Sequence, residues 1–149
     1  GRGEKITPLP DCPPLFFVLV KPAFGVSTPK VYGNLRLDLV KKHPDVEQCV
    51  QGLSAGSAEQ VLRTMGNLLE YSTFQLQPNV KHLKQHMQEL GCRHVLMSGS
   101  GPTVFAAFAD QQQAQQYYQN VKQQYPGAIL AQTVNQKMLK ERVELYGNE

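Results

Sequence analysis

The chain has 149 residues, the length of one ordinary domain, and 41% of them are hydrophobic. No apolar run approaches the ~20 residues that a membrane-spanning helix requires. Lysine and arginine number 15 against 12 acidic residues, and because this net charge of +3 is scattered, a nucleic-acid partner is not expected. Composition therefore predicts a single domain over residues 1–149, with neither a membrane nor a nucleic acid as partner.

Three cysteines, Cys12, Cys49 and Cys92, are odd in number and far apart in the sequence, which argues against a disulfide framework and a zinc site. Such cysteine usage is typical of the reducing cytoplasm. The opening residues Gly1–Glu4 include no initiator methionine, so we expect the chain to be a piece of a longer protein.

Two strands are predicted near the start of the chain, over Glu4–Leu9 and Leu15–Lys21. Prolines at positions 10, 13 and 14 exclude a helix between them.

Helical periodicity then extends over Asp45–Leu90. Ser57 and Gln60 have the spacing of a capping box. Five apolar residues repeat at helical spacing behind them: Val61, Leu62, Met65, Leu68 and Leu69. The next helix is expected to begin near Pro78 and to end at Gly91.

A glycine-rich turn follows, between strands predicted over His94–Met97 and Thr103–Phe108. Asp110 is placed to cap the next helix, which Pro126–Gly127 ends. A last strand is expected over Ala128–Val134.

The final predicted helix, about Gln136–Tyr146, is amphipathic. From Leu15 onward the order is therefore strand, helices, strand, strand, helix, strand. That order is the split βαβ arrangement, in which an antiparallel sheet carries helices on one face. The sequence predicts an α+β domain of the ferredoxin-like class.

The glycine-rich turn, Ser98–Thr103, can place backbone N–H groups and small hydroxyls around an anion. Gly99 and Gly101 can adopt positive φ without a Cβ penalty, while Ser98, Ser100 and Thr103 carry the hydroxyls. The chemistry this favours is contact with a phosphate. A simple hairpin turn is the alternative interpretation.

Three other clusters are interpreted as surface. His82 and His86 are four residues apart on a predicted helix, but they flank its apolar face and no third ligand is evident, so no metal site is expected. The glutamine-rich run 111–116 is interpreted as a solvated helix face, and the basic residues 41–43 as a surface cluster.

Several segments resemble a known family in their order and spacing. They are Gly1–Glu4 followed by Thr7–Pro8, then Lys21–Pro22, Val26–Pro29 with Tyr32, and Ser98–Ala106. Together they are similar to the C-terminal half of the GHMP kinases, over the chain from Gly1 to about Lys140.

The resemblance implies a small-molecule kinase that uses ATP and Mg²⁺ when full length. In this family the ATP-binding glycine loop, a substrate-contacting lysine and the catalytic aspartate precede the part represented here. The chain is thus expected to hold no catalytic residue and no bound cofactor, to be inactive alone, and to partner its own N-terminal kinase half and a small-molecule substrate.

Residue by residue, the resemblance places Ser27, Thr28 and Pro29 along a cytidine end of the substrate, and Tyr32 as the aromatic on which the base stacks. Pro29 also suits the first position of a short helix capped by Thr28. The alternative for Tyr32 is an ordinary half-buried aromatic that covers the sheet.

The motif Ser98, Gly99, Ser100, Gly101 and Thr103 matches the family segment near the phosphorylated end of the substrate. Two alternatives stay open. The chain could belong to another member of the family, or it could be a ferredoxin-like binding or regulatory module whose glycine turn holds a small anion or a partner.

Overall fold

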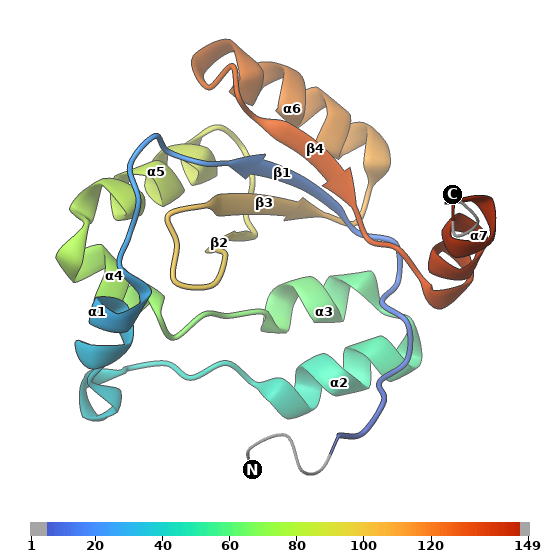
Figure 1. Cartoon of the computed structure of the whole chain (residues 1–149), viewed down its shortest axis with the longest axis horizontal. Helices are drawn as coiled ribbons and strands as arrows, with labels where there is room; N and C mark the ends of the chain where they lie inside the picture. Colours follow the sequence, from blue (N-terminus) through green and yellow to red (C-terminus); the bar gives the residue numbers. More distant parts are fainter. Residues whose placement is uncertain (1–5, 147–149) are drawn as a thin grey trace.

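A four-stranded antiparallel sheet is the centre of the structure, a computed structural model that describes residues 6–146 (Figure 1). The strands are β1 (Phe16–Val20), β2 (Val95–Met97), β3 (Val104–Phe108) and β4 (Ile129–Gln132). They lie in the order β2-β3-β1-β4, and each neighbouring pair is antiparallel. All four strands predicted from Leu15 onward are confirmed.

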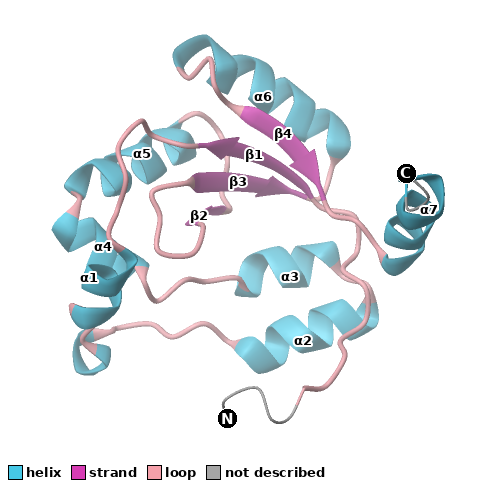
Figure 2. Ribbon diagram, viewed as in Figure 1, coloured by secondary structure: helices cyan, strands magenta, loops and turns pink. Residues whose placement is uncertain are grey.

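Helices fill the connections between the strands, as Figure 2 shows. They are α1 (Thr28–Gly33), α2 (Val46–Ala55), α3 (Ala58–Thr64), α4 (Glu70–Leu76), α5 (Pro78–Glu89), α6 (Gln111–Gln124) and α7 (Gln136–Tyr146), with a 3-10 turn η1 at Leu37–Leu39. This order confirms the predicted α+β class with its split βαβ connections.

One face of the sheet is covered by α5 and α6. Val18 of β1 and Ala106 of β3 are opposite each other in the register and fully buried on this face. They belong to one apolar cluster with Met87 of α5 and Val121 of α6. Removal of this apolar surface from water is the main stabilising contribution to the fold.

The opposite face carries α3, so the expectation that all helices lie on one face is wrong. Phe17 of β1 and Ala107 of β3 form a second cluster there with Val61 and Leu62 of α3, and α2 packs beside α3. The physical reason is visible in the strands. Both β1 and β3 are apolar at successive positions, and a strand of that kind must be covered on both sides.

The predicted starts of α3, α5 and α6 and the predicted end of α5 are confirmed. The hydroxyl of Ser57 accepts the N–H of Gln60 at 3.2 Å, while the Gln60 side chain donates to a carbonyl of α2 at 2.9 Å and leaves the capping box half formed. The Asp110 carboxylate accepts a backbone N–H of α6 at 3.0 Å. Pro78 begins α5, and Gly91 follows its end with φ of 115°.

The helix begun at Ser57 ends earlier than its apolar spacing predicts. It stops at Thr64, whose hydroxyl bonds back to the carbonyl of Gln60 at 2.7 Å, and α4 begins only at Glu70. Gly66, between them, lies so close to Pro44 that a Cβ there would meet the proline ring at 2.8 Å. Met65, Leu68 and Leu69 are thus apolar residues of a connecting segment.

The predicted strand over Glu4–Leu9 is wrong where the structure describes it. Residues 6–9 are irregular, and Gly1–Glu4 with Lys5 lies outside the described residues. Pro8 and Pro10 cannot donate to a ladder, and β1 already has a partner strand on each side.

Two of the three cysteines, which are far apart in the sequence, pack against the same apolar cluster. Cys12 and Cys49 both pack against the cluster around α3, although all three cysteines are free thiols. Burial, with a smaller contribution from Cys49, raises the pKa of the Cys12 thiol above its ordinary value.

The predicted amphipathic helix is confirmed as α7, yet the described part of the chain leaves its apolar face open. Leu139, Val143 and Leu145 are 51%, 68% and 73% exposed. In Figure 1, α7 stands apart from the sheet. Over residues 6–146, every helix is too short or too polar to cross a membrane.

The two-sided core leads to a stability prediction. Met87→Ala should lower the free energy of unfolding by about 2–5 kcal/mol, because it opens a cavity between α5 and the sheet. Val143→Ala, on the open face of α7, should change it by less than about 0.5 kcal/mol. Urea unfolding followed by circular dichroism measures both, and equal effects would contradict the packing described.

Candidate functional site

The glycine turn joins β2 to β3 and is closed by its own backbone. The N–H of Ser98 donates to the carbonyl of Thr103 at 2.8 Å, and the N–H of Gly101 donates to the carbonyl of Ser98 at 2.9 Å. Gly99 and Gly101 have φ of 56° and 84°, the region in which only glycine is unstrained. The predicted backbone role of both glycines is confirmed.

Gly101 is also required because there is no room for a side chain at this position. A Cβ at this position would lie 2.8 Å from the sulfur of Met97 and 3.4 Å from a methyl carbon of Thr73. Met97 is 1% exposed and belongs to the main apolar cluster, so it cannot move aside without disturbing the core. The turn therefore lies directly on the core.

Polar side chains just before α4 and within it form hydrogen bonds to the backbone of the turn. The Asn67 amide donates to the carbonyls of Met97 and Gly99 at 2.8 and 2.7 Å. Thr73, which is fully buried, donates through its hydroxyl to the carbonyl of Ser100 at 3.0 Å. The three carbonyls on the inner side of the turn are thus fixed by side chains.

An ion pair completes this support. One carboxylate oxygen of Glu70 accepts the N–H of Met97 at 2.8 Å, and the other is 2.7 Å from the ammonium of Lys84 on α5. The Glu70 and Lys84 side chains are only 12% and 20% exposed. A charge-assisted bond of this kind is stronger than a neutral one, so it ties α4, α5 and β2 together next to the turn.

The second predicted segment lies against the turn. Ser27, rather than Thr28, caps α1, because its hydroxyl accepts the N–H of Lys30 at 3.4 Å. Thr28 is the first residue of the helix rather than its cap, so α1 begins one residue earlier than predicted, and the Thr28 hydroxyl is free to bond the hydroxyl of Ser100 at 2.8 Å. This bond joins two motifs that are 72 residues apart in the chain.

Tyr32 projects from α1 into solvent. Its side chain is 61% exposed, whereas its neighbour Val31 is fully buried and accepts a hydrogen bond through its carbonyl from Ser72 of α4. The alternative that Tyr32 is a half-buried aromatic covering the sheet is wrong. Pro29, in the first turn of α1, is exposed as well.

The site offers donors but no reacting group. Within residues 6–146, the N–H groups of Gly99 and Ser100 make no hydrogen bond, and the Ser98 hydroxyl is exposed. Consecutive free amides beside a positive-φ glycine are suited to an anion. The hydroxyls of Thr28 and Ser100 bond only to each other among these residues, so no imidazole or carboxylate activates them as nucleophiles.

The described residues provide neither a protein-only metal cluster nor a helix N-terminus at the glycine turn for a triphosphate. No group of three or more His, Cys, Asp or Glu side chains that could hold a metal ion occurs in the described part of the chain. The glycine turn leads into a strand, not into a helix N-terminus of the kind that cradles phosphates in nucleotide sites.

A cavity of about 500 Å³ borders the turn on the side of α2 and α3. Ser98, Gly99 and Asn67 form one wall of it, and the rest is largely apolar, with Leu53 and Phe105 among the lining residues. One side of the turn thus faces this cavity.

The surface clusters are placed partly as predicted. The side chains at 41–43 are exposed, as are the glutamines of the 111–116 run. The interpretation of His82 and His86 as a solvated pair is wrong for His86, whose Nδ1 lies 2.7 Å from the hydroxyl of Tyr125.

Three supporting residues, Asn67, Glu70 and Thr73, escaped prediction from the sequence. They are polar residues inside an apolar, helix-like stretch and carry no motif of their own. The available signal was Gly66, which indicates that the helical stretch is interrupted just before these residues.

Known proteins resemble this chain over most of its length. The model of the C-terminal domain of GHMP kinases matches residues 41–127. A 4-diphosphocytidyl-2-C-methyl-D-erythritol kinase of Geobacillus sp. strain WCH70 is 43% identical over 122 residues, covering 82% of this chain and 42% of the relative. The kinase of the same name from Clostridium botulinum strain Loch Maree is 38% identical over 134 residues, covering 90% and 48%.

Solved structures agree with the fold. A crystal structure of 4-(cytidine 5'-diphospho)-2C-methyl-D-erythritol kinase has a TM-score of 0.69 at 30% identity and covers 91% of this chain and 48% of its own. Homoserine kinase from Cytophaga hutchinsonii has a TM-score of 0.67 at 22% identity, a likeness in fold alone. The chain spans less than half the length of these relatives.

The packing of the turn predicts that replacing its two glycines with alanine lowers the stability of the domain by different amounts. Gly99→Ala should cost about 1–2 kcal/mol of stability from its positive φ. Gly101→Ala should cost about 1–3 kcal/mol more, because its methyl group also collides with Met97. Chemical denaturation compares the two variants, and an equal or smaller cost at Gly101 would contradict the close approach.

Proposed function

Because this chain belongs to the GHMP kinase family, through a C-terminal domain matched over residues 41–127, we propose that it is the substrate-holding part of an ATP-dependent kinase that phosphorylates an alcohol group. The observation that carries this proposal is the bond between Thr28 and Ser100. This bond joins the Ser27–Pro29 segment to the glycine turn, the two segments that resemble motifs of the family.

The proposed substrate is 4-diphosphocytidyl-2-C-methyl-D-erythritol, an intermediate of the non-mevalonate route to isoprenoids. The names of relatives 38–43% identical to this chain support this choice over other members of the family, such as homoserine or mevalonate kinase. The exposed ring of Tyr32 supports it as well, because a cytosine base can stack on such a ring. The proposed location is the cytoplasm.

Each group of the site has a proposed role in binding. Ser27, Thr28 and Pro29 lie along the cytidine end, and Tyr32 stacks on the base. Near the other end, the free N–H groups of Gly99 and Ser100 and the hydroxyls of Ser98 and Thr103 contact substrate oxygens. These interactions orient the alcohol for reaction, which is a large part of what a kinase supplies.

The remaining parts of the reaction are assigned to the rest of the enzyme. We assign the binding of ATP and Mg²⁺ to that part, in line with the family resemblance. ATP supplies the transferred phosphoryl group, and this chain's residues hold its acceptor. The partner of this chain is then its own N-terminal kinase half.

Stacking on Tyr32 predicts a specific pattern of substitutions in the complete enzyme. Tyr32→Ala should weaken substrate binding by about 1–3 kcal/mol, the usual contribution of a base stacked on an aromatic ring. Tyr32→Phe, the matched control, should change little because the ring face is kept. Michaelis constants for the cytidine diphosphate substrate measure both, and an unchanged value for the alanine variant would remove Tyr32 from the site.

Turnover should require both halves. The purified 149-residue chain with ATP, Mg²⁺ and the substrate should form no phosphorylated product, and product should appear when the separately made N-terminal half is added. Product from the chain alone would overturn the division of roles. No product from the mixture, while the chain still bound a small anion or another protein, would favour the binding or regulatory module.

A further inference from the structure

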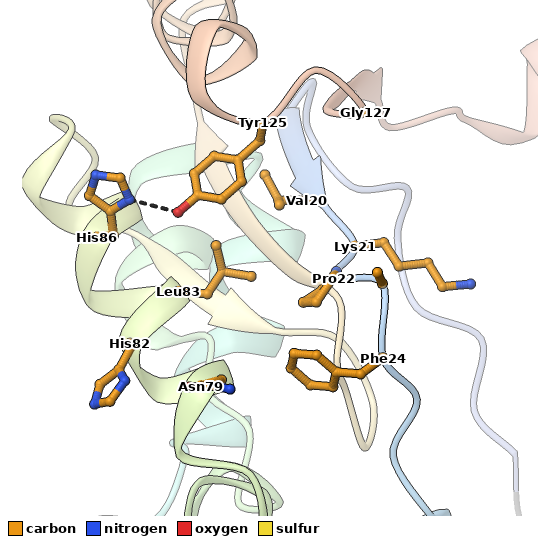
Figure 3. Close-up of a pocket in the computed structure, with 11 residues that line it drawn as sticks. Val20, Lys21, Pro22, Phe24, Asn79, His82, Leu83, His86, Tyr125 and Gly127 are labelled. Atoms are coloured by element: carbon orange, nitrogen blue, oxygen red, sulfur yellow. Dashed lines mark hydrogen bonds between the residues drawn. The ribbon is translucent and has the colours of Figure 1, made fainter.

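A second cavity, of about 490 Å³, lies where three parts of the fold meet (Figure 3). They are the end of β1 with the loop that follows it, the face of α5 that carries Asn79, Leu83 and His86, and the turn between α6 and β4. None of the residues of the candidate site lines this cavity. Its volume is in the range typical of sites for small molecules.

The interior of this cavity is apolar. Val20 and Leu83, only 4% and 7% exposed, form its base. In Figure 3 the rings of Pro22 and Phe24 face Leu83 across the same space. Phe24 also packs against the main apolar cluster, so this wall is fixed in place. A flat hydrophobic ring would be well accommodated between these side chains.

One end of the cavity is closed by a contact between α5 and the end of α6. The hydroxyl of Tyr125 lies 2.7 Å from Nδ1 of His86, and the two rings meet edge to face at 5.7 Å. Burial raises the pKa of the Tyr125 phenol, so this hydroxyl stays protonated at neutral pH and donates a hydrogen bond to Nδ1 of His86 or accepts one from it, according to the imidazole tautomer. Both polar groups are thereby satisfied by each other.

The other end carries the amide of Asn79, in the first turn of α5. This amide makes no hydrogen bond with any residue of the described range, and Figure 3 shows it beside the cavity. An amide presents one donor and one acceptor side by side. It pairs best with a group that offers the same two functions in reverse.

The apolar part of the cavity carries no charged group. No carboxylate is among the lining residues, and in Figure 3 the ammonium of Lys21 and the ring of His82 extend away from the apolar surface of Leu83, Pro22 and Phe24. An anion or a cation would lose hydration there without gaining a partner.

We propose that this cavity binds a small, flat, uncharged ring compound that carries a primary or cyclic amide. The ring lies between Leu83 and the wall of Pro22 and Phe24, and the amide edge pairs with Asn79. This site is separate from the proposed substrate site and does not depend on the proposed kinase function.

Three probes of one shape test the proposal: benzamide, benzoate and benzylamine. With the full chain in solution, benzamide should shift the methyl NMR signals of Leu83 and Val20, which lie at the base of the cavity. Benzoate and benzylamine should bind at least about 10-fold more weakly, because each brings an unpaired charge into an apolar space. Equal affinity for the three probes, or no shift at these methyl groups, would overturn the proposal.

Substitution of Asn79 separates pairing by the amide from simple apolar contact. Asn79→Ala should weaken benzamide binding about 2- to 10-fold, the range expected when one hydrogen-bonded pair is lost. Asn34→Ala, an exposed asparagine at the end of α1, is the matched control and should leave the affinity unchanged. Because Asn79 is exposed, its replacement should leave the fold intact, which circular dichroism checks. Unchanged benzamide affinity in a folded Asn79→Ala variant would refute the assigned pairing.

Discussion

The arrangement of the candidate site depends on one set of hydrogen bonds, those from the start of α4 to the backbone of the glycine turn. Asn67 and Thr73 satisfy carbonyls on the inner side of the turn, and Glu70 satisfies the N–H that enters it. With its inner groups bonded, the turn can present its remaining N–H groups outward. The fully buried Thr73 hydroxyl would otherwise be a polar group without this carbonyl partner.

This support also explains how two distant motifs meet. α4 carries Ser72, which bonds the backbone of α1, next to Thr73, which bonds the turn. Adjacent residues of one short helix therefore set the positions of both segments, and the contact between Thr28 and Ser100 is a result of that common support. A rigid scaffold of this kind is what precise binding geometry requires.

Local signals in the sequence predicted most of the fold, because caps and breakers act through neighbouring atoms. Ser57, Asp110 and Gly91 mark helix ends that the structure confirms. The errors arose where distant contacts decide. The helix after Ser57 stops at Thr64 although its apolar spacing continues, and helices occupy both faces of the sheet because β1 and β3 are apolar on both sides.

The site was predictable in part for the same reason. The conformations of Gly99 and Gly101 follow from local backbone chemistry, and both were expected. That Asn67 and Glu70 belong to the site could not be foreseen, because their role exists only through hydrogen bonds to residues about 30 positions away. The shift of the α1 cap from Thr28 to Ser27 is likewise explained by a distant partner, since the Thr28 hydroxyl bonds Ser100 instead.

The position of β1 in the sheet has a consequence for how the domain forms. Among the described residues β1 is the first strand, yet it lies in the interior of the sheet, and its partners β3 and β4 follow only after helices α1 to α5. During synthesis, its apolar residues leave the ribosome long before either neighbour exists. Pairing between strands that are this far apart in the sequence slows folding. Until β3 and β4 have been synthesised, the apolar residues of β1 are exposed to other chains, which favours aggregation. Efficient folding therefore depends on how β1 is shielded until β3 and β4 have been synthesised.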